Sequence, residues 1–205
     1  MNDKPRRGHN SIRFEIVTSY EQLLHAQAVR SICFVEEEGV AAKVIFDGND
    51  WQATHIIAYD GEEPIGTLRI RWFKDFAQFE RTAFRQAWRN SHVLRACADF
   101  AFHHVQLKGY TRVITHAAPL YARLWRMLLG FQPAPGKEPL TIEGHEHPYI
   151  ELIKVLPLLD GAITEQTNAN VLFQVEGSWT LPDARDRTVD SDLLPPAVTA
   201  AGAAG

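Results

Sequence analysis

Cysteine and long apolar runs are both scarce in this chain. Its only cysteines, Cys33 and Cys97, each lie in an apolar pattern typical of a helix. This excludes a disulfide framework or a cysteine-based metal site and predicts two buried, reduced thiols. No stretch approaches the roughly 18 consecutive apolar residues of a membrane span, and no apolar core follows the charged N-terminal residues as in a signal peptide. We therefore expect a cytoplasmic protein that does not bind a membrane.

An excess of positive charge is missing as well. The formal net charge is −4, and lysine and arginine are scattered along the chain. A basic stripe of the kind that neutralises a phosphate backbone is absent, so we expect no nucleic-acid partner. Nine histidines are present, but neither His103-His104 nor His145-x-His147 has the spacing of a helical zinc pair, and we expect no metal.

The composition suits one globular domain, because 45% of the 205 residues are hydrophobic and 22% are charged. The change of character along the chain predicts four segments. These are a flexible arm (1–11), a folded body (12–157), an extension that packs on the body (158–181) and a disordered tail (182–205).

The first half of the body combines one helix with antiparallel strands. Ser19 and Gln22 form a capping box that predicts a helix over 20–34. A long connection with one helical turn is expected over 36–53. Alternation and turn residues predict strands over 12–17, 54–59, 65–73 and 78–85. In the last of these, Phe79, Arg81 and Ala83 should face one side, and Glu80, Thr82 and Phe84 the other.

The second half has the helical period and then a parallel crossover. Helices are predicted from Ser91 to Lys108 and from Pro119 to the glycine stop at Gly130. Strands are predicted over 111–116 and 149–155. The order predicts an α/β fold with a central mixed sheet flanked by helices.

Several short runs of this sequence form a recognisable series. They are Arg30-x-x-Cys33-Phe34-Val35-Glu36-Glu37-x-Gly39-Val40, Phe46-Asp47-Gly48-x-Asp50, Ala53-x-His55, Pro64-Ile65-Gly66-Thr67-Leu68-Arg69, Phe79-Glu80-Arg81-x-Ala83-Phe84, Lys108-Gly109-Tyr110 and Gly130-Phe131. Over roughly residues 12–156, these runs resemble the GNAT superfamily of acyl-CoA N-acyltransferases. The N-terminal half is similar to members related to acyl-homoserine-lactone synthases.

The resemblance implies a loop that cradles the CoA pyrophosphate on backbone amides before the second long helix. The family pattern Q/R-x-x-G-x-G/A corresponds here to Arg89-Asn90-Ser91-His92-Val93-Leu94. Arg89 matches, whereas His92 and Leu94 replace two small residues. We expect Ser91 to cap the helix, and we expect Arg85, Arg89, His92 and Arg95 to bring positive charge to the phosphates, although a solvated basic helix end would read the same.

The resemblance also implies the catalytic groups. Backbone amides around Thr82, Ala83 and Phe84 would hold the thioester carbonyl. Glu80 is the candidate base, with a salt bridge to Arg69, Arg71 or Arg81 as the alternative. Tyr121 and Trp125 compete for the position of the general acid, and Tyr121 alone carries a titratable proton; Trp125 is then a cofactor contact.

Three further residues are candidates for binding the acceptor. Asp47 and Asp50 lie in the long connection and carry the charge to hold an ammonium group, although aspartate is also common in turns. Trp72 is a candidate for lining the pocket, although aromatic residues usually serve the core.

The resemblance therefore predicts an N-acetyltransferase that uses acetyl-CoA, or another acyl-CoA, without a covalent enzyme intermediate. The acceptor would be an amine of a small molecule or peptide, and dimerisation is compatible with such a fold. Two alternatives remain open: a longer-chain acyltransferase that resembles lactone-signal synthases, and a non-catalytic module that binds acyl-CoA or regulates a partner.

Overall fold

The fold is one mixed sheet with helices on both sides, and the computed structural model describes residues 12–141 and 147–179. The sheet order is β1-β2-β3-β4-β5-β7-β6, and within the described residues only β4 and β5 run parallel. The strands are β1 (Ile12–Ile16), β2 (Ala53–Asp60), β3 (Glu63–Trp72), β4 (Ala77–Phe84), β5 (Arg112–Ala117), β6 (Gln132–Pro133) and β7 (Ile150–Val155). The predicted α/β class is confirmed.

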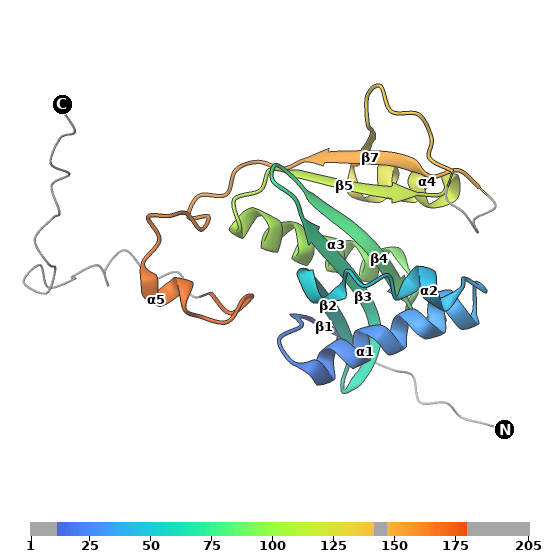
Figure 1. Ribbon diagram of the computed structural model, residues 1–205, viewed down its shortest axis with the longest axis horizontal. Helices are drawn as coiled ribbons and strands as arrows, with labels where there is room; N and C mark the ends of the chain where they lie inside the picture. Colours follow the sequence, from blue (N-terminus) through green and yellow to red (C-terminus); the bar gives the residue numbers. More distant parts are fainter. Residues whose placement is uncertain (1–11, 142–146, 180–205) are drawn as a thin grey trace, which may run out of the picture.

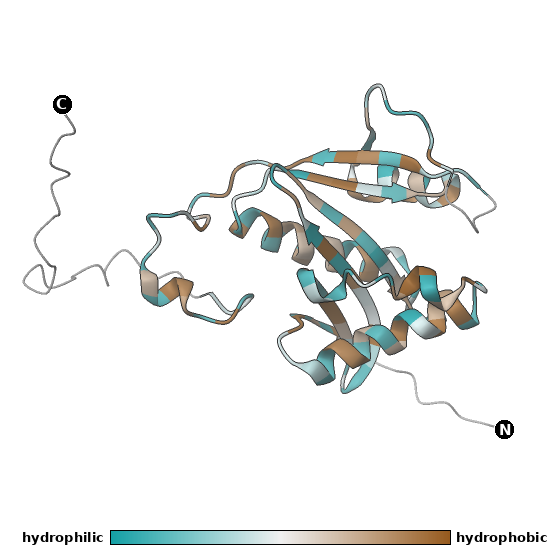
Figure 2. Cartoon of the chain, viewed as in Figure 1, coloured by the Kyte–Doolittle hydropathy of each residue, from teal (hydrophilic) through white to brown (hydrophobic). Residues whose placement is uncertain are grey.

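Alternation along the strands gives the sheet two buried faces. Ile56 packs with the side of α3 (Ser91–Leu107) and α4 (Pro119–Leu129), whereas its neighbour Ile57 packs against Ala26 of α1 (Tyr20–Arg30). Figure 1 shows α1 on one side of the sheet and α3 and α4 on the other. Figure 2 shows hydrophobic and hydrophilic residues on each of these helices, as expected where only one helix face meets a sheet.

The predicted helix over 20–34 changes its winding near the middle. The α-helix α1 ends at Arg30, and a π-helix continues over Ser31–Glu36. In it, the amide of Glu37 donates to the carbonyl of Ile32. The connection that follows contains α2 (Ala42–Ile45) and a 3₁₀ turn (Asp50–Gln52), a little more helix than the single turn predicted.

Strand β4 contains a bulge that changes which way its side chains point. Arg81 has φ = 51°, and the register with β3 shifts by one residue between Thr67 and Arg69. The predicted alternation is therefore wrong beyond Glu80. Phe79 and Phe84 both join the core under α3, while Ala83 packs against Val29 and Cys33 on the α1 side.

The same strand parts from its parallel neighbour. β4 pairs with β5 over Ala77–Phe79 only, in register with 113–115, and no described strand pairs with this edge of β4 beyond Phe79. The two strands therefore separate towards their carboxyl ends. This separation positions the candidate site.

The extension after β7 returns to the body near its end. It includes α5 (Ala169–Leu172) and reaches Glu176, which accepts hydrogen bonds from Thr54 Oγ1 (2.8 Å), His104 Nε2 (2.9 Å) and Lys108 Nζ (3.0 Å). Trp179 stacks on the His104 ring at 5.6 Å. The predicted arm over 1–11 and tail over 182–205 lie outside the described residues, and none of the described helices is long and apolar enough to cross a membrane.

Candidate functional site

A hollow lies where β4 and β5 separate. Its volume is about 620 Å³. Apolar side chains from several elements form much of the wall: Phe34, Phe79, Leu94, Leu124, Trp125 and Leu140. The cavity therefore joins an apolar slot to the polar ends of two strands, a form suited to a small-molecule ligand.

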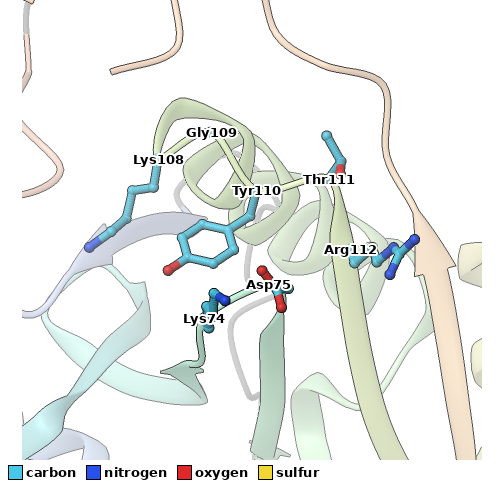
Figure 3. Close-up of a pocket in the computed structure, with 7 residues that line it drawn as sticks. All are labelled: Lys74, Asp75, Lys108, Gly109, Tyr110, Thr111 and Arg112. Carbon is cyan, nitrogen blue, oxygen red and sulfur yellow. The ribbon is translucent and has the colours of Figure 1, made fainter. Parts of the chain in front are cut away.

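A second hollow of about 560 Å³ lies at the opposite end of the same strands (Figure 3). It is bounded by the turn at Lys74 and Asp75 and by the segment from Lys108 to Arg112, whose side chains are polar or charged. The strands are paired at this end. It therefore lacks the open strand edge that distinguishes the first cavity.

The wall of the first cavity includes the free edge of β4. Thr82, Ala83 and Phe84 all line it, as predicted from the resemblance. Because β5 has left this edge, backbone amides that point towards it have no partner in a described strand. Amides on such an edge can hold a carbonyl oxygen or extend an amide-containing ligand as an added strand.

The N-terminus of α3 lies at the same cavity, but its cap differs from the prediction. The cap is Asn90, not Ser91: Asn90 Oδ1 accepts from the amides of His92 (3.1 Å) and Val93 (3.0 Å). The amide of Leu94 donates to the Asn90 carbonyl. The amides of residues 92–94, at the helix N-terminus predicted to cradle the pyrophosphate, therefore already have partners within the protein.

Arg89 lines the cavity and ties its wall together. Its Nε donates to the carbonyl of Phe84 at 2.6 Å, and its Nη2 bonds Glu37 after the π-helix. Arg85 does not reach the cavity. It pairs with Glu63 at 2.5 Å and stacks over Trp88. Of the predicted positive groups, Arg89 is the one that the structure places at the cavity wall.

A buried network of arginines and carboxylates forms the floor beside β4. Arg69, 1% exposed, bonds Asp47 (2.7 and 2.8 Å), Asp50 (2.8 Å) and Glu80 (3.0 Å through Nε). The fully buried Arg30 completes the network with two 2.8 Å bonds to Asp50. The salt-bridge alternative for Glu80 is thus present in the structure.

The network fixes the charge state of its members. Burial by itself would raise the pKa of Asp50, but the bonds from Arg30 and Arg69 lower that pKa to about 2. The pKa of Asp47 is lowered more strongly by Arg69 and Arg81, against the opposing effect of burial. Burial lowers the pKa of His55, whose Nε2 lies 3.0 Å from the Asp50 carbonyl oxygen. The aspartates therefore remain ionised and bound to arginine.

Tyr121 stands at the rim of the cavity on the first turns of α4. Its side chain is 50% exposed, and Trp125 lines the wall one turn further on. Burial and the nearby charge of Glu38 raise the pKa of Tyr121. The phenol therefore keeps its proton at neutral pH, as a general acid must before it acts.

Several predicted residues lie away from the cavity. Trp72 packs against Tyr110 and His104 and donates to Thr54 Oγ1 at 2.9 Å, beside the C-terminal extension. Val93 is buried in the core, and His92 is exposed. Asp47 reaches the cavity, whereas Asp50 lies beneath it and does not line it. The predicted acceptor contacts thus reduce to Asp47.

The structure also brings in residues that the sequence did not indicate. His116, near the end of β5, lines the cavity and pairs with Glu151 of β7 at 3.2 Å. Cys33, Glu38 and Tyr149 also line the cavity. Burial raises the pKa of the Cys33 thiol, so it is not poised as a nucleophile. The signal in the sequence for the His116–Glu151 pair was weak, because its two members lie in different strands, 35 residues apart.

Two curated bacterial proteins are similar to this chain in sequence. No family model matches the chain. The uncharacterized N-acetyltransferase YjcF of Bacillus subtilis (strain 168) is 35% identical over 78 residues, 38% of this chain and 56% of the length of that relative. A putative acetyltransferase of the same strain is 27% identical over 134 residues, 64% of this chain and 89% of that protein.

Solved structures extend the likeness to about three quarters of the chain, 72% in both examples below. A putative N-acetyltransferase from Lactobacillus plantarum is 26% identical with a TM-score of 0.65, covering 72% of this chain and 100% of that one. A GNAT family acetyltransferase from Elizabethkingia anophelis with acetyl-CoA bound has the same fold at 14% identity and a TM-score of 0.56, covering 72% of this chain and 99% of that one. In sequence and fold, the chain is therefore similar to N-acetyltransferases of the GNAT superfamily.

Proposed function

We propose that the protein transfers an acyl group from acyl-CoA to a primary amine by direct attack. The observation that carries this proposal is the cavity of about 620 Å³ opened by the parting of β4 from β5. It offers an open strand edge to the donor. The relatives are named as an uncharacterized N-acetyltransferase and a putative acetyltransferase, which supports acetyl-CoA as the donor.

The donor's thioester lies along the β4 edge in this proposal. Amides of 82–84 hold its carbonyl oxygen and stabilise the negative charge that develops there when the amine attacks. Tyr121 protonates the leaving thiolate, because its raised pKa keeps the phenol protonated at neutral pH. Glu80 serves the floor rather than the proton transfer, because Arg69 and Arg71 occupy its carboxylate.

Two features favour alternatives that the same experiment distinguishes. The apolar wall formed by Phe34, Leu94 and Leu124 favours an acyl chain longer than acetyl. The occupied amides of His92 and Val93 favour a module with weak affinity for the CoA pyrophosphate. The first alternative predicts tighter binding of longer acyl-CoAs than of acetyl-CoA, and the second predicts weak binding of every CoA thioester.

A thermal-shift titration with CoA, acetyl-CoA and longer acyl-CoAs tests the proposal, because specific binding raises the melting temperature. We expect stabilisation by acyl-CoA that is lost in Arg89→Ala and retained in Arg112→Ala, a matched control in the second hollow. Release of CoA thiol on adding amines then establishes transfer. Equal shifts in both variants, or none with any thioester in the parent protein, would contradict the proposed site.

A further inference from the structure

One pair of side chains at the cavity is arranged as a base with its positioning group. His116 of β5 and Glu151 of β7 face each other in the antiparallel register, with Nε2 and Oε2 3.2 Å apart. Both are sheltered, at 23% and 20% exposed. Lys137 Nζ lies 3.9 Å from the other carboxylate oxygen of Glu151. The strand alternation buries Val113, Thr115 and Ala117 and puts His116 on the opposite face.

This contact determines which nitrogen of the imidazole carries the proton. An ionised carboxylate can only accept, so Nε2 carries the hydrogen and donates it to Glu151. Nδ1 then keeps its lone pair, and no group among the described residues donates to it. His116 lines the cavity whereas Glu151 does not, so the imidazole stands between the carboxylate and the ligand space.

The other acidic groups on the wall are less suited to accept a proton. Glu80 is bound by Arg69, and Asp47 is bound by both Arg69 and Arg81. Glu38 engages Tyr121. The register also places His116 and Glu80 at equivalent heights on the two parted strands, because Gln78 pairs with Ile114 two residues earlier on each. His116 thus borders the opening from the β5 side, opposite the floor.

We propose that His116 is the general base that deprotonates the acceptor amine, with Glu151 as its positioning residue. This inference rests on the proposed function. The ammonium form of the acceptor gives one proton to His116 Nδ1. The neutral nitrogen then forms the C–N bond at the thioester carbon, and the C–S bond breaks as the intermediate collapses. The second nitrogen proton leaves to solvent while Tyr121 protonates the sulfur and is reprotonated from solvent, and His116 returns its proton to water.

Charged groups from several elements surround the imidazole of His116. The charged or titratable groups around the pair or on the same cavity are Glu151 of β7, Lys137, Tyr149, Glu80 and Arg81 of β4, Cys33 of the π-helix, Glu38 and Asp47 of the connection that follows it, Arg89 before α3, and Tyr121 of α4. Arg81 is paired with Asp47, and Arg89 is paired with Glu37. Glu151 is therefore the charged group in direct contact with the imidazole, at 3.2 Å.

The test is the pH dependence of acetyl transfer in His116→Gln, with His103→Gln as the matched control. His103 is an exposed residue of α3 outside the cavity. The probes are acetyl-CoA with a panel of primary amines, plus acetyl-CoA hydrolysis, which needs no known acceptor. Thiol release gives the rate, and a thermal shift with acetyl-CoA reports donor binding separately.

We expect His116→Gln to lose about 100-fold or more in kcat at neutral pH, the scale of general base catalysis, with donor binding unchanged. The parent should lose activity as the solution is acidified, because a protonated imidazole cannot accept a proton from the amine, and this acidic limb should vanish in the variant. Glu151→Gln should keep the acidic limb and lower kcat, because it removes the carboxylate that orients the imidazole. Added imidazole should restore part of the activity of His116→Ala.

Two results separate the failure of this inference from the failure of the proposed function. A His116→Gln protein that retains the parent rate and its acidic limb would overturn the base assignment and leave the transferase intact. A folded parent that binds acetyl-CoA yet releases no thiol with water or any amine would overturn both.

Discussion

The side chain of Asn90 occupies backbone amides that the CoA pyrophosphate would otherwise use, and its effect on donor binding can be measured directly. Its Oδ1 occupies the amides of His92 and Val93, at the N-terminus where the resemblance places the CoA pyrophosphate. A pyrophosphate that used these amides would have to displace the cap. We therefore predict that the side chain of Asn90 competes with the nucleotide end of acyl-CoA.

The competition has a defined magnitude. Removing an Asn cap costs about 1 kcal/mol of stability. The free energy of unfolding of Asn90→Ala, measured in urea, should therefore be lower than that of the parent by about 1 kcal/mol. The same loss releases the amides, and acyl-CoA affinity should stay level or rise by up to about fivefold, the equivalent of about 1 kcal/mol. Asn90→Asp keeps the cap but adds a negative charge, so it should weaken acyl-CoA binding.

The assay is calorimetric titration with acetyl-CoA and with S-acetyl-pantetheine, which lacks the pyrophosphate. Affinity for the shorter thioester should be the same in the parent, Asn90→Ala and Asn90→Asp. A tenfold or greater loss of acetyl-CoA affinity in Asn90→Ala, with the shorter ligand unaffected, would refute the reasoning. It would mean that the Asn90 side chain binds the nucleotide end rather than competing with it.

Three other outcomes follow from the buried charges. Arg69→Met should destabilise the protein by about 3–5 kcal/mol in urea unfolding, because it leaves buried carboxylates without their partner; a loss under 1 kcal/mol would show that the network is dispensable. The lowered pKa of Asp50 contributes stability that is present above the ordinary pKa of the group and lost as pH falls towards about 2. The difference in free energy of unfolding between the parent and Asp50→Asn should therefore shrink by roughly 2 kcal/mol between pH 6 and 2. A difference that stays constant with pH would contradict the lowered pKa. Glu176→Gln should loosen the extension at a cost of about 1 kcal/mol and speed its proteolysis, whereas an unchanged digestion rate would argue against the clasp formed with His104 and Lys108.

Local signals in the sequence accounted for much of the fold. The hairpin of β2 and β3 follows from two β-rich runs around Gly61, and α4 follows from Pro119 at its start and Gly130 at its end, where φ is 73°. These features depend on residues adjacent in sequence. The short strand β6 (Gln132–Pro133) was missed because its two residues carry no periodicity.

Features set by contacts distant in sequence escaped prediction. Nothing in the residue type of Arg81 indicates a positive φ, so the bulge that turns Ala83 to the α1 side could not be read from alternation. Asn90 and Ser91 are both good caps, and only the helix start decides between them. The pairing of His116 with Glu151 depends on the register of β5 and β7, which periodicity does not fix.

The central claim is that the donor thioester lies between the separated ends of β4 and β5. A crystal structure with bound acetyl-CoA tests it most directly. We predict the thioester carbonyl oxygen within hydrogen-bond distance of a backbone amide of 82–84, with the sulfur beside Tyr121 and the acetyl group facing His116. A ligand bound in the hollow around Lys74 and Arg112, with the β4 edge unoccupied, would contradict the account.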